Sequence, residues 1–212
     1  MSEAVVWPSF KRDLVAILRG VKPDEVEAIV GALIEEKFEA IEVPLNSPEP
    51  FRSIEIVARA FGEMAFIGAG TVLSTEDCAR VADAGGKLMV SPNVDPAVIE
   101  MASLRGMVTL PGCFTPTEAL LALRSGASAL KFFPAGSLGP AGLSAIKAVL
   151  PRNAVVGAVG GVSETTFVDY AKIGVRTFGL GSSLYKPGDG ADEVQANARR
   201  AIEAYDKVFA AG

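Results

Sequence analysis

The sequence of 212 residues contains no histidine. Histidine is the side chain most often used to move protons near pH 7, so proton transfer here must use a carboxylate, lysine, tyrosine, cysteine or bound water. A Ser-His-Asp hydrolase and a histidine-ligated metal site are both excluded. Only two cysteines occur, Cys78 and Cys113, and their spacing indicates neither a metal site nor a disulfide framework. We therefore expect no metal, no cofactor and a reducing, cytoplasmic environment.

Several features of other protein classes are also missing. The chain has no basic tail and a formal net charge of -5, which argues against nucleic acid as its main partner. An anionic metabolite stays compatible with this charge, because the local field of a pocket can oppose it. The first residues lack the basic segment and apolar run of a secretory signal. No apolar run reaches the roughly 18 residues of a membrane span, so we expect no membrane partner.

The chain instead alternates short apolar runs with longer helical patterns. The apolar runs predict strands at residues 14–18, 40–43, 65–68, 88–90, 108–110, 128–133, 155–159 and 175–180. Proline and capping residues predict helix starts near Pro23, Pro48, Ser74, Pro96, Thr115 or Thr117, Leu143, Ser163 and Ala191. The strands are continuously apolar, as expected when both faces of a parallel sheet are covered. About eight strand–helix units at this length predict an α/β fold, a (β/α)8 TIM barrel formed by residues 1–212 as a single domain.

Lys131 is the most informative polar residue of the predicted strands. Eight of the nine lysines lie in polar, helical or loop contexts, whereas Lys131 lies between Leu130 and Phe132 inside an apolar strand. Burial of an ammonium group is costly and lowers its pKa, which leaves a nucleophilic amine. The alternative is a structural lysine paired with a carboxylate. We therefore interpret Lys131 as a candidate nucleophile.

Glu42 is the second candidate catalytic residue. It lies between Ile41 and Val43 near the end of the second strand. Adjacent strand residues face opposite ways, and both faces are predicted to be buried, so Glu42 is expected to point into the barrel. Its carboxylate could act as general acid and base, or form a buried salt bridge to Lys131 or Arg19. The two roles are compatible, because an ion pair in the free protein would open when an imine forms.

Further candidates follow the strands, at the end of a barrel where active sites lie. Arg19 follows the first strand and Thr71 the third, where each could hold a substrate carboxylate. Glycine-rich turns follow the seventh and eighth strands, where barrels commonly bind phosphate through backbone N–H groups. The alternative is that these are only tight turns. The turn residues are Gly160, Gly161, Gly181, Ser182 and Ser183.

These motifs occur together and in order in one family. The matching segments are AILRG, EVPLNSP, GAGTVL, SPN, PGCFTPTEA, ALKFFPA, VGGV and GLGSSLY. Over nearly its whole length the sequence resembles the bacterial 2-keto-3-deoxy-6-phosphosugar-acid aldolases. The segments EVPLNSP and SPN are similar to the branch acting on 2-dehydro-3-deoxy-6-phosphogalactonate, whereas the 6-phosphogluconate branch typically reads EVTLRT and SPG.

The resemblance implies a class I (Schiff-base) aldolase of the aldehyde-lyase class with pyruvate and D-glyceraldehyde 3-phosphate as products. It implies that Lys131 forms the imine, that Glu42 transfers protons, and that Arg19 and Thr71 contact the keto-acid end. The glycine and serine turns would border the phosphate. The family is usually trimeric and needs no metal, so a homotrimer is expected. The segment Ala135-Gly136-Ser137 varies within the branch.

Three other interpretations stay open. A 6-phosphogluconate or dual-specificity aldolase would differ only in the recognition of hydroxyl groups. A phosphosugar isomerase or epimerase on the same barrel would have a phosphate site, but would not need a lysine inside an apolar strand. A non-catalytic phosphosugar-binding barrel would give the pairing of Lys131 with Glu42 no purpose beyond packing.

Overall fold

The computed structural model describes residues 5–209, so both ends of the domain predicted for residues 1–212 lie outside the described residues. All strands run parallel in one sheet with the order β5-β4-β3-β2-β1-β9-β8-β7-β6. They are β1 (Leu14–Ile17), β2 (Ala40–Pro44), β3 (Phe66–Gly70), β4 (Leu88–Val90), β5 (Val108–Leu110), β6 (Gly112–Cys113), β7 (Leu130–Phe132), β8 (Val156–Val159) and β9 (Thr177–Leu180).

The two strands at the ends of this order are consecutive in the chain. Only Pro111 separates β5 from β6, and proline has no N–H to continue a ladder. The Pro111 carbonyl still accepts the backbone N–H of Lys131 at 2.9 Å. Lower in the barrel, the hydroxyls of Thr109 and Ser128 each accept the other residue's backbone N–H, at 2.8 and 3.0 Å. Residues 108–113 thus act as one strand that closes the sheet, and the predicted (β/α)8 barrel is confirmed.

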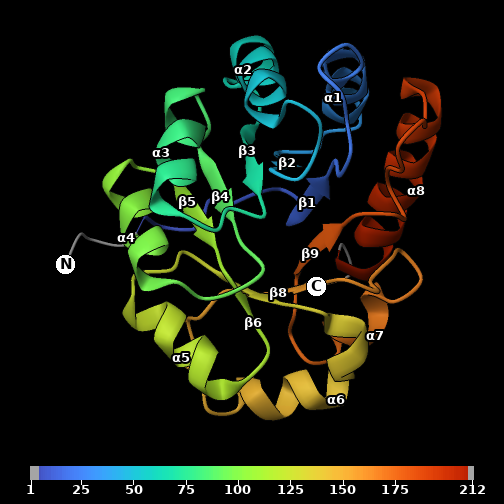
Figure 1. Ribbon diagram of the computed structural model, residues 1–212. Coiled ribbons are helices and arrows are strands. Elements are labelled where there is room, and N and C mark those ends of the chain that lie inside the picture. The colour runs from blue at the N-terminus through green and yellow to red at the C-terminus, as the bar shows by residue number, and fades with distance from the viewer. Residues whose placement is uncertain (1–4, 210–212) are drawn as a thin grey trace.

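Helices surround the strands in chain order, as the view down the barrel shows (Figure 1). They are α1 (Val26–Glu35), α2 (Pro50–Phe61), α3 (Thr75–Asp83), α4 (Pro96–Leu104), α5 (Pro116–Arg124), α6 (Ala135–Lys147), α7 (Phe167–Ala171) and α8 (Ala191–Phe209). The predicted caps Ser74 and Thr115 are confirmed, because each side chain accepts a backbone N–H of the first turn. No helix among residues 5–209 has the length and apolar character of a membrane span.

Four predicted helix starts were wrong. Helix α1 begins at Val26, three residues after the predicted Pro23, because residues 23–25 form a turn before the helix. Helix α2 begins at Pro50 rather than Pro48, after Glu49 adopts a left-handed conformation at φ 40°. Helix α6 begins at Ala135, eight residues before the predicted Leu143, and bends at Gly139. Ser163 does not cap α7. Its backbone N–H donates to the Thr166 hydroxyl, and that hydroxyl donates to the Ser163 carbonyl, in a turn before the helix.

Strand alternation gives the barrel an inner and an outer layer. Leu14 and Ala16 of β1 pack outward into the core beneath the helices, whereas Val15 belongs to a smaller cluster inside the barrel. The same alternation on β2 places Ala40 in this inner cluster and Ile41 in the outer core. Residues two positions further along each strand also point inward, above this apolar inner layer.

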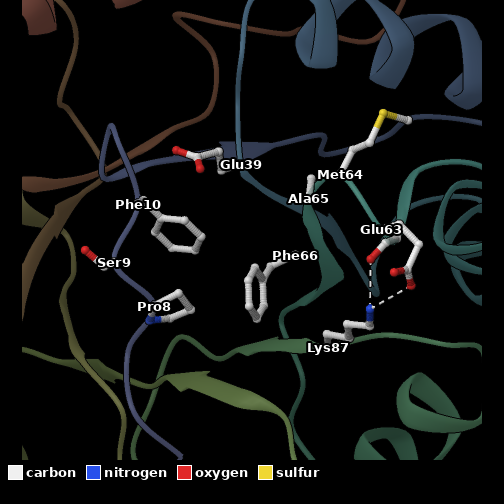
Figure 2. A pocket seen from close by; sticks show the side chains of 10 residues that line it. Pro8, Ser9, Phe10, Glu39, Glu63, Met64, Ala65, Phe66 and Lys87 are labelled. Atoms are coloured by element: carbon white, nitrogen blue, oxygen red, sulfur yellow. Dashed lines mark hydrogen bonds and ion pairs between the residues drawn. The ribbon is translucent and has the colours of Figure 1, made fainter.

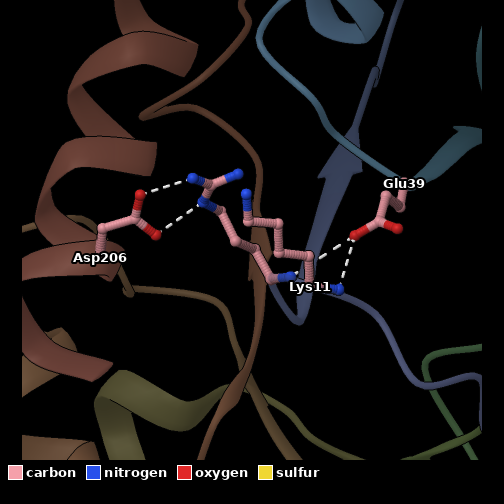
Figure 3. A network of polar contacts seen from close by, with 4 residues as sticks. Lys11, Glu39 and Asp206 are labelled. Carbon is pink, nitrogen blue, oxygen red and sulfur yellow. Dashed lines mark hydrogen bonds and ion pairs between the residues drawn. The ribbon is translucent and has the colours of Figure 1, made fainter. Parts of the chain in front are cut away.

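The segment before β1 covers the amino-terminal end of the barrel. Trp7 and Phe10 pack against the inner cluster. The Phe10 and Phe66 rings pack edge to face, with their centroids 5.5 Å apart (Figure 2). Arg12 donates two hydrogen bonds to Asp206 on α8, and Glu39 accepts the backbone N–H of Lys11 at 2.8 Å (Figure 3). This segment covers the inner apolar layer at the amino-terminal end, so the inward-facing side chains above that layer lie toward the carboxyl end of the barrel.

Candidate active site

Lys131 lies at the centre of β7 and points into the barrel. Its inward direction follows from the strand alternation, because Leu130 and Phe132 belong to the outer core. Its partners in the neighbouring strands are Gly112 and Gly157, which have no side chains to compete for the interior. Only 5% of Lys131 is exposed. The lysine thus projects a long side chain into a space that its neighbours leave open.

Glu42 reaches the same layer from β2, as predicted. It follows the inward-facing Ala40 by two residues and is only 1% exposed. Its carboxylate lies against the backbone of Gly70 on β3, where a Cβ would overlap it. Among residues 5–209, no hydrogen-bond partner contacts the Glu42 Oε2 atom. A buried carboxylate oxygen without a partner is available to a substrate or to bound water.

The two side chains influence each other's charge without forming an ion pair. Burial raises the pKa of Glu42 to about 7, and the positive charges of Lys131 and Arg19 oppose this shift only in part. Burial lowers the pKa of Lys131, and the nearby negative charge of Glu42 opposes that shift. The ion pairs found within residues 5–209 include neither side chain. Both pKa shifts favour an uncharged amine and a proton-carrying carboxyl near neutral pH.

Lys131 opens into a cavity of about 430 Å³ at the carboxyl end of the barrel. The cavity lies between the ends of β1, β7, β8 and β9, and most predicted site residues line it. Those that do so are Arg19, Lys131, Gly160, Gly161, Gly181, Ser182 and Ser183. Glu42 and Thr71 are not part of its lining. Thr71 follows β3 with φ 57°, directly after the glycine that contacts Glu42.

The glycine turns bring main chain close to the cavity. Gly160 and Gly161 both have positive φ, at 83° and 74°, a conformation that glycine adopts without steric cost. A Cβ at Gly160 would lie 3.0 Å from the ring of Phe133. In the second turn, the buried hydroxyl of Ser183 has no hydrogen-bond partner among residues 5–209. This end of the cavity therefore offers backbone and hydroxyl groups of the kind that bind an anion.

Arg19 lies at the mouth of the cavity and is held by the loop after β2. Its guanidinium donates a hydrogen bond to the side-chain oxygen of Asn46 at 2.5 Å. The neighbouring Ser47 hydroxyl accepts the backbone N–H of Gly20 at 2.9 Å. Arg19 retains further N–H donors, so this anchoring leaves it able to bind a carboxylate.

Seven residues of the lining were not predicted as site residues: Ile17, Phe133, Val159, Val162, Ser163, Gly179 and Lys186. Phe133 is 37% exposed, and its ring centroid lies 4.9 Å from the Lys131 Nζ. The period of two in β7 could have identified it, because Phe133 follows Lys131 by two residues. Lys186 lines the cavity three residues after Ser183. Its sequence context is that of an ordinary loop lysine and gave no such signal.

Comparison with known proteins relates this arrangement to one family. The sequence model of the KDPG and KHG aldolases matches residues 10–203. The probable 2-dehydro-3-deoxy-6-phosphogalactonate aldolase of Rhizobium meliloti (strain 1021) is 61% identical over 207 residues, which cover 98% of each chain. The 2-dehydro-3-deoxy-6-phosphogalactonate aldolase of Escherichia coli (strain K12) is 45% identical over 195 residues, covering 92% of this chain and 95% of that protein.

The same relationship holds in three dimensions. A solved structure described as native KDPGal superposes with a TM-score of 0.94 at 43% sequence identity. The superposition covers 97% of this chain and 99% of the other. The family match extends from the segment before β1 into α8 and so contains every strand and both glycine turns. The chain therefore belongs to the KDPG and KHG aldolase family.

Proposed function

We propose that this protein is a class I aldolase that cleaves 2-dehydro-3-deoxy-6-phosphogalactonate to pyruvate and D-glyceraldehyde 3-phosphate. The observation that carries the proposal is the buried Lys131 amine, which has a lowered pKa and opens into the cavity. An unprotonated amine is the form that attacks a ketone. The two phosphogalactonate aldolase relatives support the choice of substrate, with 61% and 45% identity.

In the first step, Lys131 Nζ attacks the C2 ketone and forms a carbinolamine. Glu42 carries a proton near neutral pH and donates it to the departing hydroxyl, so that water leaves and a cationic imine remains. The ionised Glu42 carboxylate then faces the new positive charge. The raised pKa allows one carboxyl group to act as acid and then as base in a chain without histidine.

In the second step, the imine accepts electrons from the breaking C3–C4 bond. Glu42, directly or through water, takes the proton of the C4 hydroxyl, and D-glyceraldehyde 3-phosphate leaves as an aldehyde. The remaining enamine is protonated at C3, and water then hydrolyses the imine to release pyruvate. The cycle consumes no net water and needs no redox partner or metal.

The cavity suggests how the two ends of the substrate are bound. Arg19 would hold the carboxylate by charge-assisted hydrogen bonds, and the Thr71 hydroxyl, which follows β3 outside the cavity lining, is proposed as a second contact to it. The phosphate would lie against backbone N–H groups and hydroxyls of the two glycine turns. The residues proposed there are Gly160, Gly161, Gly181, Ser182 and Ser183.

The decisive experiment compares the two C4 epimers, the 6-phosphogalactonate and 6-phosphogluconate substrates, by kcat/KM for pyruvate release. A hydroxyl that loses its partner in a buried site costs about 1–3 kcal/mol, so we expect a preference of roughly 5- to 150-fold for the galactonate epimer. A clear preference for the gluconate epimer would refute the substrate assignment and leave the imine mechanism standing. Equal rates would favour a dual-specificity aldolase.

We also propose a homotrimer in the cytoplasm. The family resemblance supports the trimer, and the two cysteines, both free and buried, are compatible with a reducing compartment. With a chain of 22.0 kDa, three copies give about 66 kDa. Light scattering at micromolar concentration tests this value, and a mass near that of one chain would contradict it.

A further inference from the structure

The charge of the cavity differs from that of the whole chain. Two cationic side chains, Arg19 and Lys186, line it beside the Lys131 amine, and the described residues of its lining include no aspartate or glutamate. The chain as a whole carries a formal net charge of -5. A cleft lined by one sign of charge concentrates ligands of the opposite sign. The lining therefore favours an anionic ligand, although the chain as a whole is negatively charged.

The three basic side chains differ in how they are engaged. Lys131 is buried at the floor and Arg19 is hydrogen-bonded to Asn46. The Lys186 Nζ makes neither an ion pair nor a hydrogen bond among residues 5–209. Lys186 lies on the same loop as Ser182 and Ser183, the hydroxyl residues of the proposed phosphate position. One cation beside these serines is thus without a partner.

The backbone of Lys186 is fixed although its side chain is exposed. Its N–H donates to the Asp189 carboxylate at 2.7 Å, and the Asp189 N–H donates back to the Lys186 carbonyl at 3.0 Å. The preceding Tyr185 is buried and donates its hydroxyl proton to Glu25 at 3.0 Å. The following Pro187 packs so closely on Gly20 that a Cβ there would lie 2.7 Å from Pro187 Cγ. Only the side chain of Lys186 is free to follow a ligand.

We propose that Lys186 binds the substrate phosphate and thereby sets the preference for phosphorylated over unphosphorylated substrates. This inference rests on the proposed function. A phosphate monoester carries about -1.5 to -2 charges at pH 7. The glycine N–H groups and serine hydroxyls supply neutral donors, whereas Lys186 supplies a full positive charge. A charge-assisted contact is roughly twice as strong as a neutral one.

The test measures the reverse, condensation reaction of pyruvate with D-glyceraldehyde 3-phosphate or with unphosphorylated D-glyceraldehyde. Lys186→Gln should lower kcat/KM for the phosphorylated aldehyde by about tenfold, mostly through KM, because the contact is charged but exposed to solvent. The rate with D-glyceraldehyde should stay within about twofold of wild type. Lys186→Arg should restore most of the loss, and inhibition by inorganic phosphate should weaken in Lys186→Gln.

Lys172→Gln is the matched control. It removes the same charge from an exposed lysine that follows the last residue of α7 and forms an ion pair with Asp169 of that helix at 2.8 Å. It should leave both rates unchanged. If Lys186→Gln lowered kcat/KM equally with both aldehydes, or with neither, the inference about Lys186 would be overturned. The proposed phosphate site at the glycine turns would still stand. Wild-type enzyme that uses both aldehydes equally well would instead refute the phosphate site itself, and Lys186 with it.

Discussion

The Glu42 carboxylate rests directly on the backbone of Gly70, in the space that any larger residue at position 70 would fill. The two residues belong to neighbouring strands, and Gly70 pairs with Pro44, two residues beyond Glu42. The glycine thus fixes how deeply the carboxylate can lie in the barrel. Position 70 controls the geometry of a group that it does not contact through any side chain of its own.

Gly70→Ala should therefore displace Glu42 and impair proton transfer. General acid–base catalysis contributes roughly 10²- to 10⁴-fold, so we expect kcat to fall by about 100-fold or more. Steady-state kinetics measures this loss. Gly31→Ala in α1 is the matched control, because a Cβ there meets only the Phe61 ring at 3.7 Å. That control should keep full activity and gain up to about 1 kcal/mol of stability. Full activity of Gly70→Ala would contradict the proposed role of Glu42.

Lys131 should carry the covalent intermediate. Borohydride reduction in the presence of pyruvate should add mass to one peptide, the one that contains Lys131, as peptide mass spectrometry would reveal. Lys131→Met should abolish trapping and nearly all turnover yet fold, because it replaces a buried amine by an apolar side chain of similar length. Labelling at another lysine, or none in active enzyme, would disprove the imine assignment.

The stability of the protein should depend on the ionisation of Glu42. Its pKa of about 7 in the folded state lies above the value of roughly 4.3 in an unfolded chain. Its protonated form therefore stabilises the fold in full below about pH 4, and this contribution is lost as the pH rises through 7. Glu42→Gln cannot ionise. As the pH rises from 5 to 8, the free energy of unfolding of Glu42→Gln should increase relative to that of wild type, by up to about 3 kcal/mol.

Urea denaturation at several pH values checks this prediction. The same substitution in a Lys131→Met background gives a further control. Lys131 lowers the pKa of Glu42, so its removal should move the pH window upward. A difference between Glu42→Gln and wild type that does not vary with pH would show that Glu42 titrates normally.

The first glycine turn should tolerate no negative charge. Gly161→Asp would place a carboxylate at the proposed phosphate position and should raise KM for the phosphorylated substrate by at least tenfold through like-charge repulsion. Gly161 has φ 74°, so any side chain also strains the turn. Gly161→Ala introduces that strain without the charge, and the difference in KM between the two variants isolates the repulsion. Equal KM values would place the phosphate elsewhere.

The sequence predicted the barrel and its inward-facing residues because both depend on local pattern. Continuous apolar runs marked the strands, strand alternation placed Glu42 inside, and the apolar neighbours of Lys131 singled it out. The break at Pro111 was not predicted, because residues 108–113 act as one strand only through pairing with both neighbours. The start of α2 was misplaced because two prolines, Pro48 and Pro50, gave the same local signal.

The site was predicted less completely than the fold. Arg19 and the glycine turns could be located, because they follow strands directly. The contact of Arg19 with Asn46 could not, since it joins two loops that only the barrel brings together. The position of Lys186 could not be predicted either, because Tyr185 and Pro187 fix its loop through contacts with residues far away in the sequence.

The cavity around Lys131 includes residues from both sides of the seam between the first and the last strand. Ile17 and Arg19 come from the β1 side and Gly181 from the β9 side, and these two strands pair directly. Arg12 and Asp206, 194 residues apart, link the flanking segments. A chain emerging from the ribosome therefore makes one side of this seam first and the adjoining side last. The cavity is complete only once the last strand has paired with the first.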